Sequence, residues 1–424
     1  WKKLTIDTFI RGEIPLWNPY SFAGNPHIAN YQSGVFSPFN LLFFVLPFID
    51  AWSILVLLQP LIAGLFMYLF VREIRVGRVG SLISSVSFMF SGFMVVWMAY
   101  ATLSYAILYL PLALFAVERY YKNGSIKFLL LLIAAVSLSF FSGHFQISLY
   151  FLIALICYIL FRAFIKRSIR STTFLLISVV VGLIIAAPQL LPSIMLYKHS
   201  IRSELFQVGE AIPFQYLVTV IAPDFFGNPV TRNDWFGHYA EWSSFIGIWP
   251  LFLAIYAIVR LRSWTILFFS ILGISCVALA VNSPLSVLLV SLKLPVLSTS
   301  ALSRIIVLFS FSFAVLAGLG FDALQNDLKT KKSKKAIEIF ILMLVFLIAV
   351  WFIILVTKVY PDEWLIVAKR NFILPTALFG LGLFIILLNI SLKHKKLVLI
   401  TLLFLLLASS LDSLRFAQKW MPFD

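Results

Sequence analysis

The sequence contains 424 residues, of which 62% are hydrophobic and only 12% are charged, and its mean hydropathy is +1.01. No soluble domain has this balance, so composition predicts an all-α polytopic transmembrane helix bundle. A formal net charge of +16 would suggest nucleic acid as the partner of a soluble protein. Here the positive-inside rule explains the charge, because basic residues collect in cytoplasmic loops. We therefore expect membrane lipids, and no nucleic acid, as partners.

The first 40 residues form a polar segment in which glycine and proline recur, so they cannot be one continuous helix. Such a segment cannot cross hydrocarbon, because its backbone polar groups would be left unpaired. We expect it to lie at or outside the membrane surface, with a short interfacial helix over residues 1–11. The apolar face of that helix would consist of Leu4, Ile6, Phe9 and Ile10.

About twelve apolar runs follow, each long enough or nearly long enough to span a bilayer. The first six lie at about 52–71, 80–97, 104–120, 127–142, 145–163 and 173–192. The second six lie at about 243–260, 264–281, 304–320, 336–357, 372–391 and 396–412.

Threading these runs alternately through the membrane puts 20 of the 33 basic residues on one side, which predicts that side to be cytoplasmic. The lysine-rich loop 322–335 is the strongest example. The two long polar segments then face outward, away from the cytoplasm. We expect four parts: an outer segment at 1–40, a first transmembrane group at 41–192, a large outer loop with interfacial helices at 193–242, and a second transmembrane group at 243–424.

Two carboxylates of the large outer loop are candidate catalytic bases. Glu241 directly precedes a span, and Asp224 follows Pro223 at the end of an apolar patch. A carboxylate at a water–membrane boundary can have a raised pKa and act as a base, or it can hold a divalent metal ion, here Glu241 together with Asp224 or His238. The alternative is a solvated loop whose tryptophans form an interfacial belt. The sequence does not require a metal cofactor.

Three basic residues at the outer ends of spans are candidate ligands for an anionic substrate. Arg304 opens a span, and the planar fork of its guanidinium suits a phosphate group. Lys198 and Arg202 form a second basic cluster just outside the span that ends near Pro192. Snorkelling and interfacial anchoring explain all three residues equally well.

Further polar residues of the outer segments are candidate hydrogen-bonding contacts to a polar substrate. His144 and Gln146 lie in a short outer turn, where a histidine satisfied by its neighbours is the ordinary alternative. Amides in a segment rich in proline and glycine also cap turns. The remaining candidates are Trp17, Asn18, Asn25, Gln32 and His238.

Several motifs occur in a fixed order over most of the chain: Trp17-Asn18-Pro19-Tyr20, Ser142-Gly143-His144-Phe145-Gln146, Pro188-Gln189-Leu190-Leu191-Pro192, Arg304 and the run AGLGFDAL. In this order they resemble the bacterial YfhO membrane-protein family. The resemblance implies a GT-C type glycosyltransferase of the hexosyltransferase class. Such an enzyme moves a sugar from a polyprenyl-phosphate-linked donor to a cell-envelope acceptor, such as a teichoic-acid-type polymer, on the outer face.

The catalytic aspartate of GT-C enzymes usually lies in the first outer loop, soon after the first span. This sequence begins downstream of that point, so we expect the base to lie upstream. Asp7 lies too far along the chain to take that role by position, but it is retained as a candidate. A transporter or flippase for lipid-linked sugars, or a non-catalytic accessory protein, is the alternative. A transporter predicts ionisable residues at mid-membrane and internal repeats. The span interiors are almost free of charge, which favours an interfacial enzyme; the oligomeric state is not specified.

Overall fold

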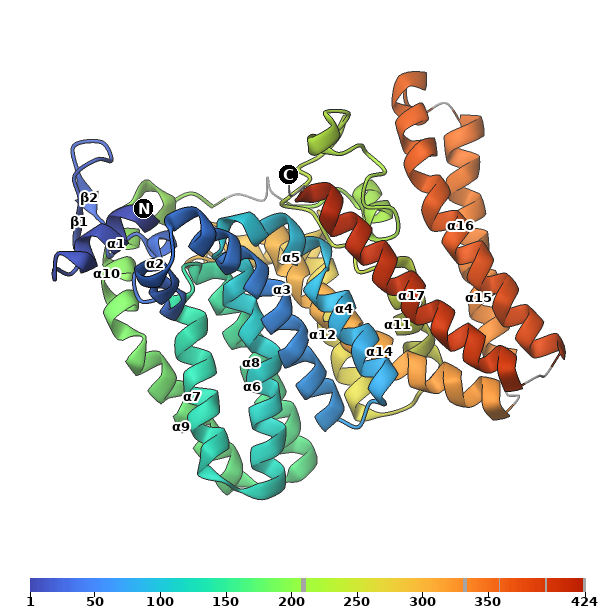
Figure 1. Ribbon diagram of the computed structural model, residues 1–424, viewed down its shortest axis with the longest axis horizontal. Coiled ribbons are helices and arrows are strands. Elements are labelled where there is room, and N and C mark those ends of the chain that lie inside the picture. The colour runs from blue at the N-terminus through green and yellow to red at the C-terminus, as the bar shows by residue number, and fades with distance from the viewer. Residues whose placement is uncertain (207–210, 331–333, 358, 393–394, 422–424) are drawn as a thin grey trace. The chain divides into compact units, whose positions relative to one another are not determined.

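The computed structural model describes residues 1–206, 211–330, 334–357, 359–392 and 395–421 (Figure 1). Lys331, Lys332 and Lys393, which contribute to the predicted cytoplasmic charge, lie outside the described residues. The described chain is mostly helical, with one antiparallel hairpin of β1 (Trp17–Asn18) and β2 (Asn25–Pro26). This confirms the predicted all-α class.

The chain divides into two compact units, and each is described here by itself. Unit 1 comprises Trp1–Ile74, Trp97–Gly209 and Pro284–Leu302, and unit 2 comprises Arg75–Val96, Glu210–Ser283 and Ser303–Asp424.

Unit 1 is built around α6, which is buried along most of its length and packs against α3, α7 and α8. One end of this bundle carries ion pairs between helices: Arg119 with Glu73 at 3.1 Å, and Arg162 with Glu118. The opposite end carries the first 40 residues. Its α-helices are α1 (Lys2–Ile10), α2 (Leu42–Val45), α3 (Phe48–Glu73), α6 (Leu103–Asn123), α7 (Ile126–Phe141), α8 (Phe145–Lys166), α9 (Ile169–Ile185), α10 (Ala187–Lys198) and α13 (Pro284–Ser291).

Unit 2 is built around α14, which packs against α4, α11 and α12. Two glycines of α14 allow this close approach, because a small residue at a helix interface lets the backbones come together. A Cβ atom at Gly320 would lie 1.8 Å from the Leu253 carbonyl oxygen, and one at Gly318 would lie 2.7 Å from that of Gly80. The α-helices of this part are α4 (Arg78–Met89), α5 (Gly92–Trp97), α11 (Ile248–Arg260), α12 (Trp264–Ala280), α14 (Ile306–Thr330), α15 (Lys334–Phe352), α16 (Asp362–Leu392) and α17 (Lys395–Trp420).

Each of the twelve predicted apolar runs is helical, but the helices differ in length. Seven are long and apolar enough to cross a membrane in the described part of the chain, or nine if two bent pairs each count as one span. The pair α4 and α5 is bent by 44°, and the pair α9 and α10 by 69°, just before Pro188. The helices α7, α11 and α12 are shorter. The predicted count of about twelve is therefore only loosely supported.

The predicted helix over residues 1–11 is present as α1, but of the four residues of its predicted apolar face only Ile6 is fully buried in the protein. Thr5, Ile6 and Thr8 are buried, whereas Ile10 is 65% exposed. The reason is tertiary: the Thr5 hydroxyl is hydrogen-bonded to Nε2 of the buried His27 at 2.8 Å, which fixes the rotation of the helix. In the large outer loop, the expected interfacial helices are short 3-10 turns, η4 (Ile201–Ser203), η5 (Phe214–Val220) and η6 (Pro229–Thr231).

Candidate functional site

Unit 1 contains a cavity of about 780 Å³ at the end where the first 40 residues pack on the helices. Its walls come from four segments far apart in the sequence, and we call it the head cavity. The lining residues are Ala29, Asn30, Tyr31, Gln32, Gly143, His144, Phe145, Gln146, Leu149, Ser193, Ile194, Leu196, Tyr197, Lys198, Ser200, Arg202, Pro295, Val296 and Ser300.

The first wall is the 3-10 turn η1 (Tyr31–Ser33), which is fixed locally at both ends. The Asn30 side chain accepts a hydrogen bond from the Gln32 N–H, and Gly34 ends the turn at a φ of 56°. The Tyr31 hydroxyl donates to the Phe140 carbonyl. Burial raises the pKa of Tyr31, so this hydroxyl stays protonated and remains a donor.

The second wall is the turn that opens α8. The His144 Nδ1 accepts a hydrogen bond from the Ile147 N–H, so a neutral His144 carries its proton on Nε2 and acts there as a donor. Gly143 has a φ of 94°, which a side chain rarely adopts. The Gln146 Nε2 donates to the Ala301 carbonyl at 2.7 Å. Because His144 caps the N-terminus of the 22-residue helix α8, the positive end of the dipole of this helix lies at the cavity wall.

The third wall is the backbone between α13 and Leu302. Val296 has a φ of 67°, which is strained for a β-branched residue. The Tyr197 hydroxyl holds this backbone in place, because it accepts from the Val296 N–H at 3.2 Å and is hydrogen-bonded to the Thr299 hydroxyl at 2.6 Å. Sequence reasoning missed Tyr31 and Tyr197, although each directly precedes a predicted site residue.

Lys198 and Arg202 supply the cations of the head cavity. Both are exposed, no ion pair is seen for either in the described chain, and no carboxylate is among the lining residues. Leu149, Ile194 and Val296 contribute apolar surface beside them. The cavity thus combines positive charge, polar donors and apolar walls, which suits a ligand with an anionic group and an apolar part.

The structure brings together five of the predicted substrate-binding residues at this cavity: Gln32, His144, Gln146, Lys198 and Arg202. Their grouping could not be deduced from spacing, since they come from three distant segments.

Other candidates in unit 1 lie elsewhere. Trp17, Asn18 and Asn25 belong to the β1–β2 hairpin, where the buried Asn18 accepts from the Tyr20 N–H. Asp7 lies on the partly exposed side of α1 and forms an i,i+4 ion pair with Lys3 at 3.3 Å. A surface pair of this kind is typical of a solvated helix. Asp7 is thus a partly exposed carboxylate whose ion-pair partner is a surface lysine, which favours a role in helix stability over one as a base.

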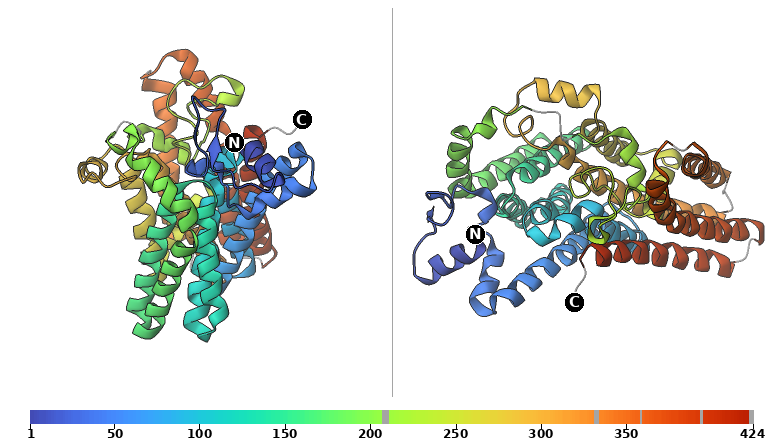
Figure 2. Two further views of the ribbon diagram at one scale, coloured as in Figure 1. Left: turned by 90° about the vertical axis from the view of Figure 1, so that its left-hand side faces the viewer. Right: turned by 90° about the horizontal axis from the view of Figure 1, so that it is seen from above.

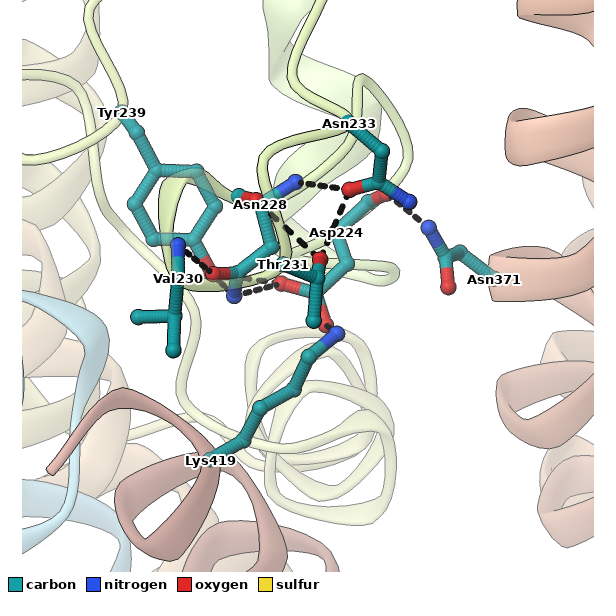
Figure 3. A network of polar contacts seen from close by, with 8 residues as sticks. All are labelled: Asp224, Asn228, Val230, Thr231, Asn233, Tyr239, Asn371 and Lys419. Carbon is teal, nitrogen blue, oxygen red and sulfur yellow. Dashed lines mark hydrogen bonds and ion pairs between the residues drawn. The ribbon is translucent and has the colours of Figure 1, made fainter. Parts of the chain in front are cut away.

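Asp224 of unit 2 lies in a network of polar contacts (Figure 3). It is 4% exposed and accepts hydrogen bonds from the Tyr239 hydroxyl at 2.6 Å and Asn228 Nδ2 at 2.8 Å. Its other carboxylate oxygen pairs with the Lys419 ammonium at 2.6 Å, and its backbone carbonyl accepts from Asn371 Nδ2. Burial and the charge of Asp224 raise the pKa of Tyr239. These contacts tie the outer loop to α16 and α17, which favours a structural role.

Glu241 and Arg304, the predicted base and the predicted phosphate ligand, are partners of each other in unit 2. The Arg304 guanidinium contacts both carboxylate oxygens of Glu241, at 2.7 and 2.5 Å. About a fifth of each side chain is exposed. The ring of His238 packs against Trp242, with 5.1 Å between centroids. Among the described residues, there is no cluster of three or more His, Cys, Asp or Glu side chains that could hold a metal ion.

The family model described as bacterial membrane protein YfhO matches residues 26–419, nearly the whole chain. Two crystal structures of ArnT from Cupriavidus metallidurans have a similar fold. The one bound to undecaprenyl phosphate has a TM-score of 0.51 and 13% identity, over 99% of this chain and 72% of that chain. The apo structure has a TM-score of 0.51 and 14% identity, over 99% and 71%.

No curated protein matches the chain. At such low identities, the likeness to ArnT shows the fold alone, and that fold is the GT-C architecture that the sequence resemblance implies. The chain is therefore a polytopic membrane protein with a GT-C-like fold, and it belongs to the YfhO family of bacterial membrane proteins.

Proposed function

We propose that the protein is a membrane glycosyltransferase that moves a sugar from a polyprenyl-phosphate-linked donor to a cell-envelope acceptor. The head cavity is the observation that carries this proposal, because its two cations and its donors fit a phosphate group beside an apolar wall. The ArnT structure that shares the fold holds undecaprenyl phosphate, which supports the same class of donor. Transfer would take place on the outer face of the plasma membrane, and a teichoic-acid-type polymer is the proposed acceptor.

In this reaction an acceptor hydroxyl attacks the anomeric carbon of the donor sugar, and the bond between that carbon and the phosphate oxygen breaks. The polyprenyl phosphate leaves with the bonding electron pair, and a base takes the proton of the acceptor. Lys198 and Arg202 would stabilise the negative charge that grows on the leaving phosphate. The N-terminal end of α8 adds positive potential at the same wall. Gln146 would act by holding the cavity wall in place, because its Nε2 donates to the Tyr150 hydroxyl and to the Ala301 carbonyl, and His144 lines the same wall.

Gln32 completes the proposed binding set at the head cavity, and Arg304 of unit 2 remains a separate candidate ligand for an anionic group. For the base we keep Glu241 as the first candidate of this sequence, ahead of Asp224 and Asp7. Glu241 retains some exposure, whereas Asp224 is engaged by Tyr239, Asn228 and Lys419. Arg304 contacts both carboxylate oxygens of Glu241. Glu241 could therefore accept a proton only after Arg304 has released it, for example to bind a phosphate group instead.

The test uses the full-length protein in sealed proteoliposomes, whose two leaflets can be distinguished, with a radiolabelled undecaprenyl-phosphate hexose, and follows label into isolated cell-wall polymer. The variant Lys198→Gln/Arg202→Gln should bind undecaprenyl phosphate at least tenfold more weakly, since charge-assisted hydrogen bonds contribute about 1.5–3 kcal/mol each. Lys3→Gln is the matched control, because Lys3 is an exposed lysine of unit 1 that does not line the cavity.

Three outcomes separate the hypotheses. Label transferred by the wild type and lost in the double variant supports the enzyme. Label that changes leaflet without transfer would replace the enzyme by a flippase. If the protein binds the lipid in the presence of the native acceptor, but label is neither transferred nor moved between leaflets, the result would support an accessory protein that presents a lipid-linked sugar.

A further inference from the structure

The third wall of the head cavity contains a backbone outlier, Val296. In the described part of the chain, seven residues other than glycine have a positive φ, and Val296, at 67°, is the single β-branched one. It is also the one residue of these seven that lines the head cavity. A β-branched residue at positive φ is strained, and such strain persists only where the surrounding structure imposes it. A strained residue at a cavity wall points to a role at that cavity.

The strain lies in a γ-turn centred on Val296. The Leu297 N–H donates to the Pro295 carbonyl at 2.8 Å across this residue, and a γ-turn with a positive central φ is rare and strained. The turn is closed by two further hydrogen bonds. The Ser298 N–H donates to the Leu294 carbonyl at 2.9 Å, and the Leu294 N–H donates to the Ser298 hydroxyl at 3.0 Å. The position of Val296 is therefore set by its own segment.

The Tyr197 hydroxyl connects this turn to the end of α10. It accepts from the Val296 N–H at 3.2 Å and is hydrogen-bonded to the Thr299 hydroxyl at 2.6 Å. The contact joins α10 to the segment after α13, which are green and gold in Figure 2. Lys198, the next residue of α10, is one of the two cations of the cavity. A single hydroxyl thus holds the strained turn against the helix that carries a cation.

The use of a valine in this turn has to be sought in its side chain. Glycine would adopt the same φ without strain, so valine is the less stable choice for the backbone. The Val296 side chain is apolar and half-buried, and Leu149 and Ile194 contribute to the same apolar surface. Lys198 and Arg202 attract a phosphate group whether or not it carries a hydrocarbon chain. Only the apolar surface can distinguish these two classes of ligand.

We propose that Val296 is a specificity-determining residue of the head cavity. Held in its strained turn by Tyr197, it provides an apolar contact that selects a phosphate carrying a hydrocarbon chain over a phosphate without one. Tyr197 is then a positioning residue, because it acts through Val296. The inference rests on the proposed function, since it concerns how the proposed donor is recognised at the same cavity.

The experiment titrates the full-length protein in nanodiscs with two probes that share a phosphate group, undecaprenyl phosphate and glycerol phosphate. The wild type should bind undecaprenyl phosphate more tightly. Val296→Gly should weaken binding of undecaprenyl phosphate about tenfold, because the apolar contact is lost, and should leave the affinity for glycerol phosphate unchanged. The midpoint of thermal unfolding should not fall, because glycine adopts a positive φ without strain.

Ala101→Gly is the matched control for this substitution. Ala101 also has a positive φ, of 53°, and belongs to unit 1, but it does not line the cavity. The variant should bind both probes as the wild type does.

Tyr197→Phe removes the hydroxyl that holds the turn, and it should weaken binding of undecaprenyl phosphate about threefold to tenfold. In the Val296→Gly background the same substitution should have little further effect, since no side chain remains to be positioned. Tyr121→Phe is the control, because the Tyr121 hydroxyl is hydrogen-bonded to that of Thr172 at 2.8 Å and Tyr121 does not line the cavity. It should leave both affinities unchanged.

Equal affinities of Val296→Gly and the wild type for undecaprenyl phosphate would overturn the inference. So would the loss of both probes together with a lower unfolding midpoint, because Val296 would then have a structural role only. The transfer of labelled sugar is measured separately. Transfer that does not depend on Val296 would refute this inference alone, whereas selective binding without transfer would refute the enzyme and leave the inference in place.

Discussion

The head cavity of unit 1 and the polar network around Asp224 in unit 2 use similar side chains in opposite ways. At the cavity, Lys198 and Arg202 are exposed, and no carboxylate lines the space beside them. In the network, Asp224 is buried and meets Lys419, Asn228 and Tyr239 within 2.8 Å. A charge whose partners are already present stabilises the fold, whereas a charge that faces a cavity remains available to a ligand. From this contrast we expect ligand binding at the cavity and a structural role for the network.

The largest expected effect comes from breaking the network on one side only. Asp224→Asn should destabilise unit 2 by about 3 kcal/mol, because removing one partner leaves the Lys419 charge poorly compensated. The measurement is the midpoint of thermal unfolding in detergent. The double variant Asp224→Asn/Lys419→Met should recover much of the loss. Equal midpoints for the wild type and Asp224→Asn would show that the ion pair does not hold the outer loop.

The next effect sharpens the cavity side of the comparison. Arg202→Gln alone should weaken binding of undecaprenyl phosphate about tenfold, through the loss of one charge-assisted contact, and leave the unfolding midpoint unchanged. Binding is measured by titration in nanodiscs. A lower midpoint with unchanged binding would make Arg202 structural, like Lys419, and would remove the contrast between the two regions.

A smaller effect concerns Gln146, which bridges the turn before α8 to the opposite wall through the Ala301 carbonyl. Gln146→Leu should leave that carbonyl without its donor and loosen the wall, which we expect to weaken lipid binding about threefold to tenfold. The same titration measures it. Gln59→Leu is the control, since Gln59 makes a comparable contact to the Met98 carbonyl at 2.8 Å within unit 1 and does not line the cavity. A loss of similar size in both variants would mean a general effect on the unit.

The smallest effect is a pH dependence in the support of the hairpin. Burial lowers the pKa of His27 below 6.5, so the unfolded segment binds a proton more readily than the folded one. The stability of this segment should therefore fall as the pH falls below about 6.5. Hydrogen exchange of residues 1–40, compared at pH 5 and pH 7.5 after correction for the intrinsic rate, measures it. His27→Gln should flatten the difference, and an unchanged difference in that variant would assign it to another group.

The amino-acid sequence by itself determined the class of the protein. In a bilayer, the backbone N–H and C=O groups of these long apolar runs are all hydrogen-bonded only if the runs are helical. The opening segment, which is rich in turns, could not cross the bilayer for the same reason. The motifs from Trp17 to Arg304 were enough to indicate the YfhO family and its GT-C fold, which the family match and the likeness to ArnT confirm. These features are local or periodic, so they can be found without knowing which segments meet.

Only the tertiary structure decided which polar residues share a site. It grouped His144 and Gln146 with Lys198 and Arg202, left Trp17 on a separate hairpin, and paired Glu241 with Arg304, 63 residues away. It also turned α1 so that Thr5 is buried against His27 beside Ile6, a contact that the apolar pattern alone does not predict. The physical reason is that a charged side chain has the same sequence signature whether its partner is a ligand, water or another side chain. Which partner it meets depends on long-range packing, and spacing along the chain does not encode that.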